Sequence, residues 1–390
     1  MTSSAFTNIQ TLVTNNPELG DGALGLVTGA HVVVENGVVA AISKAKPSGV
    51  DIEIDCSGKT LLPGFVDSHT HLIFAGDRAE EFAERAKGNR YTAGGIATTV
   101  LATRSASDNQ LRENTQKLLN EALASGTTTV EIKSGYGLTE RDESRSIDIA
   151  SEFTDETTLL AAHVIPADFK DNPESYVNLV IEKMIPESRA KWIDVFCDQG
   201  AFDIEQTQRI LRAGVEHGMK PRIHANQLQR TAAIQLAIEL GAFSADHLSA
   251  STQEDIEALA NSNVVATLLP GAEFSTSHEG KLGRKFLDAG AQVAIASDCN
   301  PGSSFTTSMP FCIAAAVSLL GFTVEEAVHA ATFGGARALG REDIGRVGVG
   351  ARADFALLST PSYIHLAYRP GVNIVSNTYK AGMAVTQWQK

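Results

Sequence analysis

The stretch GFVDSHTHL, at residues 64–72, joins an apolar run to two histidines that are spaced two residues apart. The apolar residues from Leu61 to Val66 lead directly into it, which is typical of a buried strand. Side chains at i and i+2 leave the same face of a strand, so His69 and His71 can bind one metal ion together. Because a lone His-x-His pair also arises by coincidence, the motif needs further ligands to support it.

Three further candidate ligands, His224, His247 and Asp298, each lie at the end of a separate short apolar run. Histidine nitrogens combined with a carboxylate, with room left for a water molecule, are typical of a hydrolytic metal centre. The ordered set agrees with the pattern of apolar segments around it, which coincidence does not explain. We therefore expect a metal site built from distant parts of the chain.

Eight short apolar runs are predicted to be buried strands. They are Gly64–Leu72, Thr127–Lys133, Thr157–Val164, Trp192–Asp198, Pro221–Asn226, Ala242–Leu248, Val264–Leu269 and Gln292–Asp298. Most of the intervals have helical patterns: Thr139–Phe153 opens like a capping box, and Asp203–His217 carries an apolar stripe at helical spacing. This alternation predicts an α/β fold with a (β/α)8 TIM-like barrel. The candidate ligands end runs one, five, six and eight, on the face where barrel enzymes carry their active sites.

Both chain ends show strand patterns of another kind. Val27–Ile42 alternates around the turn Glu35-Asn36-Gly37, which is a hairpin signal. Gly345–Leu358 and Asn373–Val385 are predicted to be short strands with glycine-rich turns. Neither end has enough apolar length to fold alone. We therefore expect residues 1–62 and 345–390 to form one small β-sandwich domain beside a barrel of residues 63–344.

Composition excludes several classes of protein. The chain has 390 residues, of which 43% are hydrophobic and 20% charged, as in an ordinary globular enzyme. Its net charge of −14 disfavours nucleic acid and anionic membrane surfaces as partners. We expect a cytoplasmic protein, because no apolar run is long enough for a membrane span and the first residues lack a signal-peptide pattern. Four scattered cysteines argue against a disulfide framework, and Cys299 is interpreted as a packing residue.

Longer motifs extend over nearly the whole chain. They are PGFVDSHTHLIFAGDRAEEF from Pro63, GGI from Gly94, TTTVEIKSGYGL from Thr127, AAHVIP from Ala161, DVFCDQGAF from Asp194, IHANQ from Ile223, SADHL from Ser244, LLPGAEF from Leu268 and SDCNPGSS from Ser297. On these motifs the chain resembles the amidohydrolase superfamily and, within it, the imidazolonepropionases of histidine degradation. The resemblance implies hydrolysis of the cyclic amide of 4-imidazolone-5-propanoate to N-formimidoyl-L-glutamate by a metal-activated water, and it implies a homodimer.

The resemblance also assigns the metal and catalytic residues. It implies one Zn²⁺ or Fe³⁺ per chain, bound by His69, His71, His224 and Asp298. His247 would stabilise the developing oxyanion or pass a proton to the leaving nitrogen, and Asp298 would accept a proton from water. The alternative for His247 is a buried, hydrogen-bonded histidine beside Asp246.

By resemblance, seven residues contact the small anionic substrate: Arg78, Tyr136, His163, Gln227, Asn300, Gly302 and Ser303. Arg78 can bind the propionate carboxylate through two parallel hydrogen bonds, and the acidic chain needs such a local cation. Its alternative is a solvated arginine at the start of a surface helix. Some family members have glutamate at the position of Gln227, and the amide found here cannot act as a base.

Other interpretations stay open at this point. Lys133 ends the second strand, and a carboxylated lysine bridges two metals in some relatives; the alternative is a structural lysine near the pocket rim. The chain can also be a deaminase of a heterocyclic base, or a metal-binding barrel protein without activity. The choice between zinc and iron, and closure of a loop over residues 76–103, are not decided by these residues.

Overall fold

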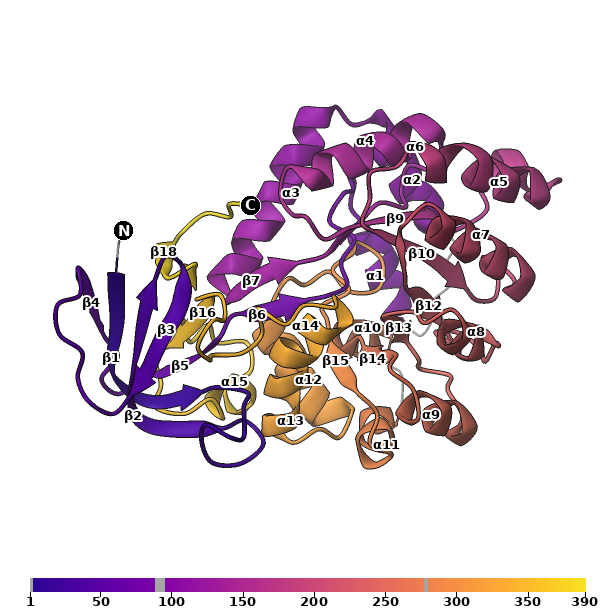
Figure 1. The fold of residues 1–390 in the computed structure, drawn as a ribbon. Coiled ribbons are helices and arrows are strands. Elements are labelled where there is room, and N and C mark those ends of the chain that lie inside the picture. Colours follow the sequence, from indigo (N-terminus) through magenta and orange to yellow (C-terminus); the bar gives the residue numbers. More distant parts are fainter. Residues whose placement is uncertain (1–2, 88–94, 277–279) are drawn as a thin grey trace.

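The computed structural model describes residues 3–87, 95–276 and 280–390, and Figure 1 shows a barrel surrounded by helices with a separate sheet beside it. Gly94 of the GGI motif lies outside the described residues, as does part of the predicted 76–103 loop. Among the described residues, no helix is both long enough and apolar enough to cross a membrane.

The barrel strands follow the predicted apolar runs. They are β6 (Phe65–Asp67), β7 (Thr127–Val130), β8 (Ile132–Lys133), β9 (Thr157–Ala162), β10 (Trp192–Cys197), β11 (Lys220–Pro221), β12 (Ile223–Ala225), β13 (Ser244–His247), β14 (Val265–Leu268) and β15 (Val293–Ile295). They pair in parallel in the order β15-β14-β13-β12-β10-β9-β8, while β6 pairs with β7 and β11 with β10. The ring closes at a parallel bridge between Thr70 and Cys299, where the His71 amide donates to the Cys299 carbonyl over 2.9 Å. The predicted barrel is confirmed.

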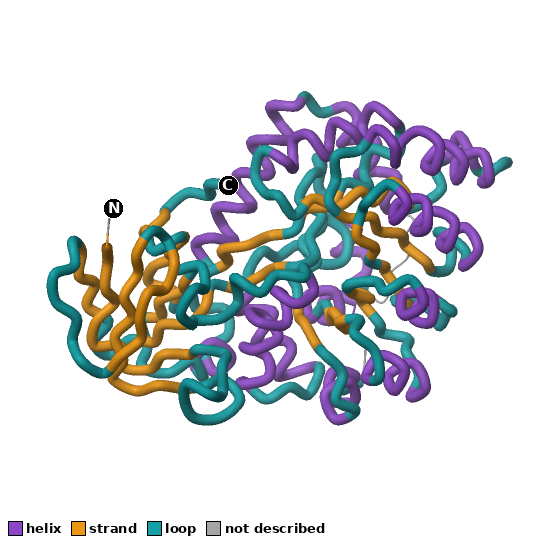
Figure 2. The backbone as a smooth tube through the Cα atoms, in the orientation of Figure 1, coloured by secondary structure: helices purple, strands orange, loops and turns teal. Residues whose placement is uncertain are grey.

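Helices cover the outside of the strands, as Figure 2 shows. They are α1 (Ala79–Arg85), α2 (Ile96–Ser105), α3 (Asp108–Ala124), α4 (Glu140–Ser151), α5 (Pro173–Leu179), α6 (Ile185–Glu187), α7 (Ile204–Glu216), α8 (Ala233–Glu239), α9 (Gln253–Ala260), α10 (Pro270–Thr276), α11 (Leu282–Asp288), α12 (Met309–Leu319), α13 (Val324–His329), α14 (Gly335–Ala338) and α15 (His365–Tyr368). The predicted capping residue of α4 is confirmed, because the Thr139 hydroxyl accepts from the Asp142 amide over 3.1 Å. Asp203 caps α7 in the same way, accepting from the Gln206 amide over 2.8 Å.

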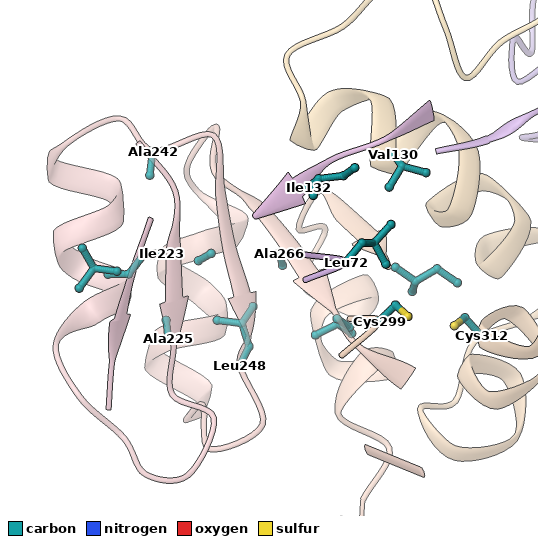
Figure 3. Packing of buried hydrophobic residues seen from close by; sticks show 14 of the residues in the cluster. Leu72, Val130, Ile132, Ile223, Ala225, Ala242, Leu248, Ala266, Cys299 and Cys312 are labelled. Carbon is teal, nitrogen blue, oxygen red and sulfur yellow. The ribbon is translucent and has the colours of Figure 1, made fainter. Parts of the chain in front are cut away.

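Apolar side chains fill the layer between the strands and the helices. Figure 3 shows Leu72, Ile132 and Ile223 among the buried residues of this cluster. Cys299 and Cys312 are fully buried in the same cluster, so Cys299 packs as expected and burial raises the pKa of its thiol well above the ordinary value. The polar site described below therefore lies within a close-packed apolar shell.

The strands of both chain ends form one sheet. They are β1 (Ser3–Val13), β2 (Leu26–Glu35), β3 (Val38–Ser43), β4 (Ile52–Asp55), β5 (Thr60–Pro63), β16 (Phe355–Leu358), β17 (Val375–Lys380) and β18 (Met383–Val385), in the order β18-β17-β16-β5-β1-β2-β3 with β4 on β1. The β2–β3 turn has positive φ at Asn36 (52°) and Gly37 (80°), as a tight hairpin requires. The sheet has its own apolar cluster, in which Phe6 packs edge-on against Phe355 at 5.2 Å between ring centroids. The predicted β structure from both ends is thus present, while the boundaries at residues 62 and 345 stay a prediction.

Candidate active site

Four of the predicted ligands meet at the C-terminal end of the barrel. His69 and His71 follow β6, His224 lies in β12, and Asp298 follows β15. The Nε2 atom of His71 lies 3.3 Å from that of His69, 3.4 Å from that of His224 and 3.4 Å from Oδ1 of Asp298. All four residues are at most 3% exposed. Their donor atoms therefore surround one point that is shielded from solvent.

Carboxylates behind two of the histidines determine which nitrogen faces that point. Asp246 Oδ2 lies 2.7 Å from Nδ1 of His69, and Asp194 Oδ1 lies 3.0 Å from Nδ1 of His224. Each carboxylate accepts the Nδ1–H of its histidine, which leaves the Nε2 lone pair directed at the centre. Burial lowers the pKa of His69 well below its ordinary value, so the imidazole is neutral, as a metal ligand must be. Three imidazole nitrogens and one carboxylate oxygen fit a zinc or iron ion.

A buried network of charges supports these two carboxylates. Lys133 Nζ lies 2.9 Å from Asp194 Oδ2 and 3.0 Å from Glu131 Oε1. Arg222 Nη2 lies 3.1 Å from Asp246 Oδ2, and all of these side chains are fully buried. Burial would raise the pKa of Asp194, but the hydrogen bond from His224 and the charge of Lys133 outweigh it and hold the pKa well below the ordinary value. The rim position considered for Lys133 is wrong, and two flanking carboxylates favour its ammonium form over a carboxylated, anionic one.

His247 ends β13 beside the same point. Its ring centroid lies 5.2 Å from that of His224 and 5.6 Å from that of His69. Its backbone φ of 77° is left-handed, as are those of Asn226 and Asp298 at 52°. Such conformations cost energy in residues other than glycine, and they cluster here at the ends of barrel strands. Asp246 Oδ2 bonds to His69 and Arg222 rather than to His247, its neighbour in the alternative interpretation.

One pocket opens over the metal ligands. It is lined by His71, Arg78, Ile96, Tyr136, His163, Phe196, His224, Gln227, Leu228, His247, Asp298, Asn300 and Ser303. Six of the seven predicted substrate contacts are among these residues. The seventh, Gly302, packs against Arg78 so closely that a Cβ atom there would lie 2.4 Å from Nη1 of the guanidinium. The predicted substrate residues are therefore gathered around the predicted metal site.

Arg78 is not the solvated surface residue of the alternative interpretation, because it is only 7% exposed. Its Nε donates to Glu81 Oε2 over 2.8 Å, and its Nη2 donates to Glu81 Oε1 over 2.6 Å. This two-bond pair holds the plane of the guanidinium. Glu81 was missed by the sequence analysis, although an acid three residues ahead on a helix is a recognisable signal.

Local hydrogen bonds also hold two of the substrate loops. Asp198 accepts from the amides of Leu228 over 2.8 Å and Gln229 over 3.2 Å, next to Gln227. The Asn300 side chain accepts from the amides of Gly302 and Ser303, both over 2.8 Å. No role was predicted from the sequence for Asp198, Asp194, Glu131 or Arg222. The signal that could have found them is the presence of a charged residue inside an apolar run, which must be paired when buried.

Comparison with known proteins agrees with this geometry. The pattern of the amidohydrolase family matches residues 60–385. An imidazolonepropionase from Mycolicibacterium smegmatis is 54% identical over 100% of this chain and 98% of its own length. One from Rhodococcus jostii is 54% identical over 97% of this chain and 94% of its own.

Solved structures show the same fold at low identity. An atrazine chlorohydrolase variant from Arthrobacter aurescens, complexed with zinc and atraton, has a TM-score of 0.74 at 18% identity and covers 98% of this chain and 94% of its own. An adenosine deaminase from Xanthomonas campestris with bound zinc has a TM-score of 0.72 at 18% identity, covering 100% and 94%. Together, the barrel, the buried ligand set and these relatives show that the chain belongs to the amidohydrolase family and, within it, to the imidazolonepropionases.

Proposed function

We propose that this chain hydrolyses the cyclic amide of 4-imidazolone-5-propanoate to N-formimidoyl-L-glutamate, as a step of histidine degradation. The observation that carries the proposal is the sharing of one pocket by a buried His/Asp ligand set and a buried arginine. Identity of 54% to imidazolonepropionases over the whole chain supports the same reaction. A substrate with a ring amide and an anionic side chain needs the metal ligands for the amide and the arginine for the anion.

We assign one Zn²⁺ or Fe³⁺ to His69, His71, His224 and Asp298. When bound there, such an ion would polarise the ring carbonyl and lower the pKa of a water molecule. The carboxylates of Asp246 and Asp194 fix the orientation of His69 and His224 before any ion binds. The protein's own contribution is thus a set of nitrogen donors whose orientation is already fixed.

Asp298 is suited to take a proton from the attacking water. Burial raises the pKa of its carboxyl group, which makes it a stronger base than a solvated aspartate. The Ser303 hydroxyl donates to Asp298 Oδ2 over 3.2 Å and so holds the carboxylate in place. The water oxygen becomes part of the new carboxylate, the ring C–N bond breaks, and the proton taken by Asp298 passes to the leaving nitrogen.

His247 is suited to stabilise the oxygen that gains negative charge. Burial lowers the pKa of His247 to about 3, although the Asp298 carboxylate opposes the shift. The imidazole is therefore neutral at pH 7 and can donate its N–H to an oxyanion, without first losing a positive charge. This favours hydrogen-bond donation over the role of a preformed cationic acid.

Arg78 would bind the propionate. Glu81 binds Nε and Nη2 of the guanidinium, and Nη1 of Arg78 faces Gly302 in the loop after β15. The net charge of −14 works against a free anion, so a local cation must provide the attraction. Cytoplasmic location and a homodimer stay predictions beside this proposal.

The test combines metal analysis with an absorbance assay. Loss of the ultraviolet absorbance of imidazolone-propionate is expected on adding the metal-loaded protein, and not after treatment with a chelator. Guanine and cytosine are the controls, since a deaminase of a neutral base would act on them instead. A metal-loaded protein that leaves imidazolone-propionate intact would contradict the proposal, and turnover of a neutral base would replace it with the deaminase alternative.

A further inference from the structure

Glu143 is a buried acid with no part in the chemistry above. It lies in α4, is 1% exposed, and its side chain points at the loop that follows β8. Its Oε1 accepts from the amides of Gly137 over 2.8 Å and Leu138 over 2.7 Å. Its Oε2 accepts from the amide of Gly135 over 3.1 Å. Three of the four backbone amides of residues 135–138 are therefore bound by one carboxylate.

The loop fits tightly against the helix that carries Glu143. A Cβ atom at Gly137 would lie 2.6 Å from the carbonyl carbon of Asp142, so glycine is needed for this approach. Leu138 has a left-handed φ of 53°, a conformation that costs energy in a leucine. A strained loop persists only where other interactions hold it, and the three bonds to Glu143 are such interactions.

This loop determines the placement of two residues of the pocket. Tyr136 lies within it and lines the pocket. The Gly135 carbonyl oxygen lies 3.0 Å from Nδ1 of His163 and accepts a hydrogen bond from that nitrogen. The His163 ring stacks on His71 at 5.3 Å and lies 5.3 Å from the Tyr136 ring. A displacement of the loop would move Tyr136 and release His163 together.

We propose that Glu143 is a positioning residue, which fixes the 135–138 loop so that Tyr136 and His163 face the substrate. The proposal rests on the function proposed above, because it takes these two residues as substrate contacts. The chemistry requires a carboxylate: three N–H donors approach two oxygens, whereas a glutamine has one oxygen and would turn its NH₂ group toward an N–H. Hydrogen bonds to a charged acceptor are also the stronger kind.

The test compares Glu143→Gln with Glu140→Gln, an exposed acid in the first turn of the same helix. In Glu143→Gln, kcat/KM for imidazolone-propionate should fall about tenfold or more, because small displacements of positioning groups cost that much. In Glu140→Gln it should not change. Tyr136→Phe is then combined with Glu143→Gln, and its effect on kcat/KM should be smaller in that background by about fivefold or more. An equal effect of Tyr136→Phe in both backgrounds would overturn the proposal, since a purely structural role leaves the two changes independent.

Hydrogen exchange separates this inference from the proposed function. The peptide spanning residues 134–139 should exchange at least roughly tenfold faster in Glu143→Gln than in the wild type or in Glu140→Gln. If the wild type does not act on imidazolone-propionate, the proposed function fails, and the exchange result alone decides whether Glu143 holds the loop. Unchanged exchange overturns the role of Glu143 in either case. If Glu143→Gln does not fold, Gly137→Ala displaces the loop while keeping the carboxylate, and the same faster exchange and weaker dependence on Tyr136 are expected.

Discussion

Two groups of residues in the pocket are supported in different ways. We call the ligands His69, His71, His224 and Asp298 the metal wall, and Arg78 with the loop at residues 300–303 the substrate wall. In the metal wall, His69 is backed by Asp246, 177 residues away, and His224 by Asp194, 30 residues away. In the substrate wall, Arg78 is backed by Glu81, three residues ahead on the next helix, and the Asn300 side chain binds the amides of its own loop. The metal wall therefore depends on the closed barrel, whereas Arg78 and the Asn300 loop are held within their own short segments.

This difference predicts how far a substitution should be felt. The supports of the metal wall are charges in a dry interior, where an ion left without its partner costs several kcal/mol. The supports of the substrate wall lie near the pocket opening, and Glu81 has a side chain that is 33% exposed. Changes in the first wall should affect metal and fold together, while changes in the second should affect substrate alone.

The largest effect is expected from His224→Ala. It removes one of four ligands, so the variant should lose the bound metal and nearly all turnover. Metal analysis of the purified protein is the measurement, and His217→Ala, at the exposed C-terminal cap of α7, is the control. Full metal occupancy and activity in His224→Ala would show that the metal wall is wrongly assigned.

Lys133→Met should destabilise the whole barrel. It removes the buried ammonium group that pairs with Asp194 and Glu131, while Arg222 stays 3.6 Å from Glu131. Breaking a buried pair in this way costs about 3–5 kcal/mol of the free energy of unfolding. Denaturant titration measures the loss. Lys87→Met, which breaks an exposed pair with Glu84, should leave the midpoint nearly unchanged. Equal midpoints for the two variants would remove the distinction between buried and local support.

His247→Ala tests a residue that touches the chemistry without supporting the fold. The variant should keep its metal and its unfolding midpoint but lose about a hundredfold or more in kcat, because one positioned hydrogen-bond donor is removed. Steady-state kinetics at pH 7 measure it. Turnover close to that of the wild type would make His247 a structural residue only.

Arg78→Met tests the substrate wall. Metal content should be unchanged. The value of kcat/KM for the propionate substrate should fall roughly thirtyfold, chiefly through a higher KM, which corresponds to about 2 kcal/mol of lost transition-state stabilisation. An analogue without the carboxylate should be turned over poorly by the wild type and no worse by the variant. If kcat/KM falls equally for the propionate substrate and for the neutral analogue, Arg78 does not recognise the carboxylate, and the deaminase alternative gains support.

The smallest effect concerns Lys380, a half-buried lysine outside the barrel. Burial, partly opposed by Asp354, lowers the pKa of Lys380 from 10.5 to about 8. Between these two values the folded state binds fewer protons than the unfolded state, so the free energy of unfolding should rise with pH across this window. Lys380→Met should flatten that rise, as measured by urea titration at about pH 7.5, 9 and 10.5. If the free energy of unfolding rises with pH as steeply in the variant as in the wild type, groups other than Lys380 cause the rise.

Most of the barrel and the donor atoms of the metal wall could be predicted from sequence. Apolar runs of strand length alternate with capped helices, and the carboxyl ends of parallel strands meet on one face. We therefore expected His69, His71, His224 and Asp298 to converge, and in the structure Nε2 of His71 lies within 3.4 Å of donor atoms of the other three. The hairpin of β2 and β3 was also predictable, because Asn36-Gly37 allows the left-handed turn.

The partners of these residues were decided only by the tertiary structure. Asp246 is the neighbour of His247 in the chain, but it bonds to His69, which follows β6 and lies 177 residues away. Likewise, Lys133 lies in the barrel interior beside Asp194, and the Glu143 side chain binds the loop at residues 135–138, which comes just before its helix α4. Residue order and periodicity specify strands, helices and donor atoms, because these depend on neighbours along the chain. The pairing of buried charges depends on the register between strands, which exists only once the barrel has closed.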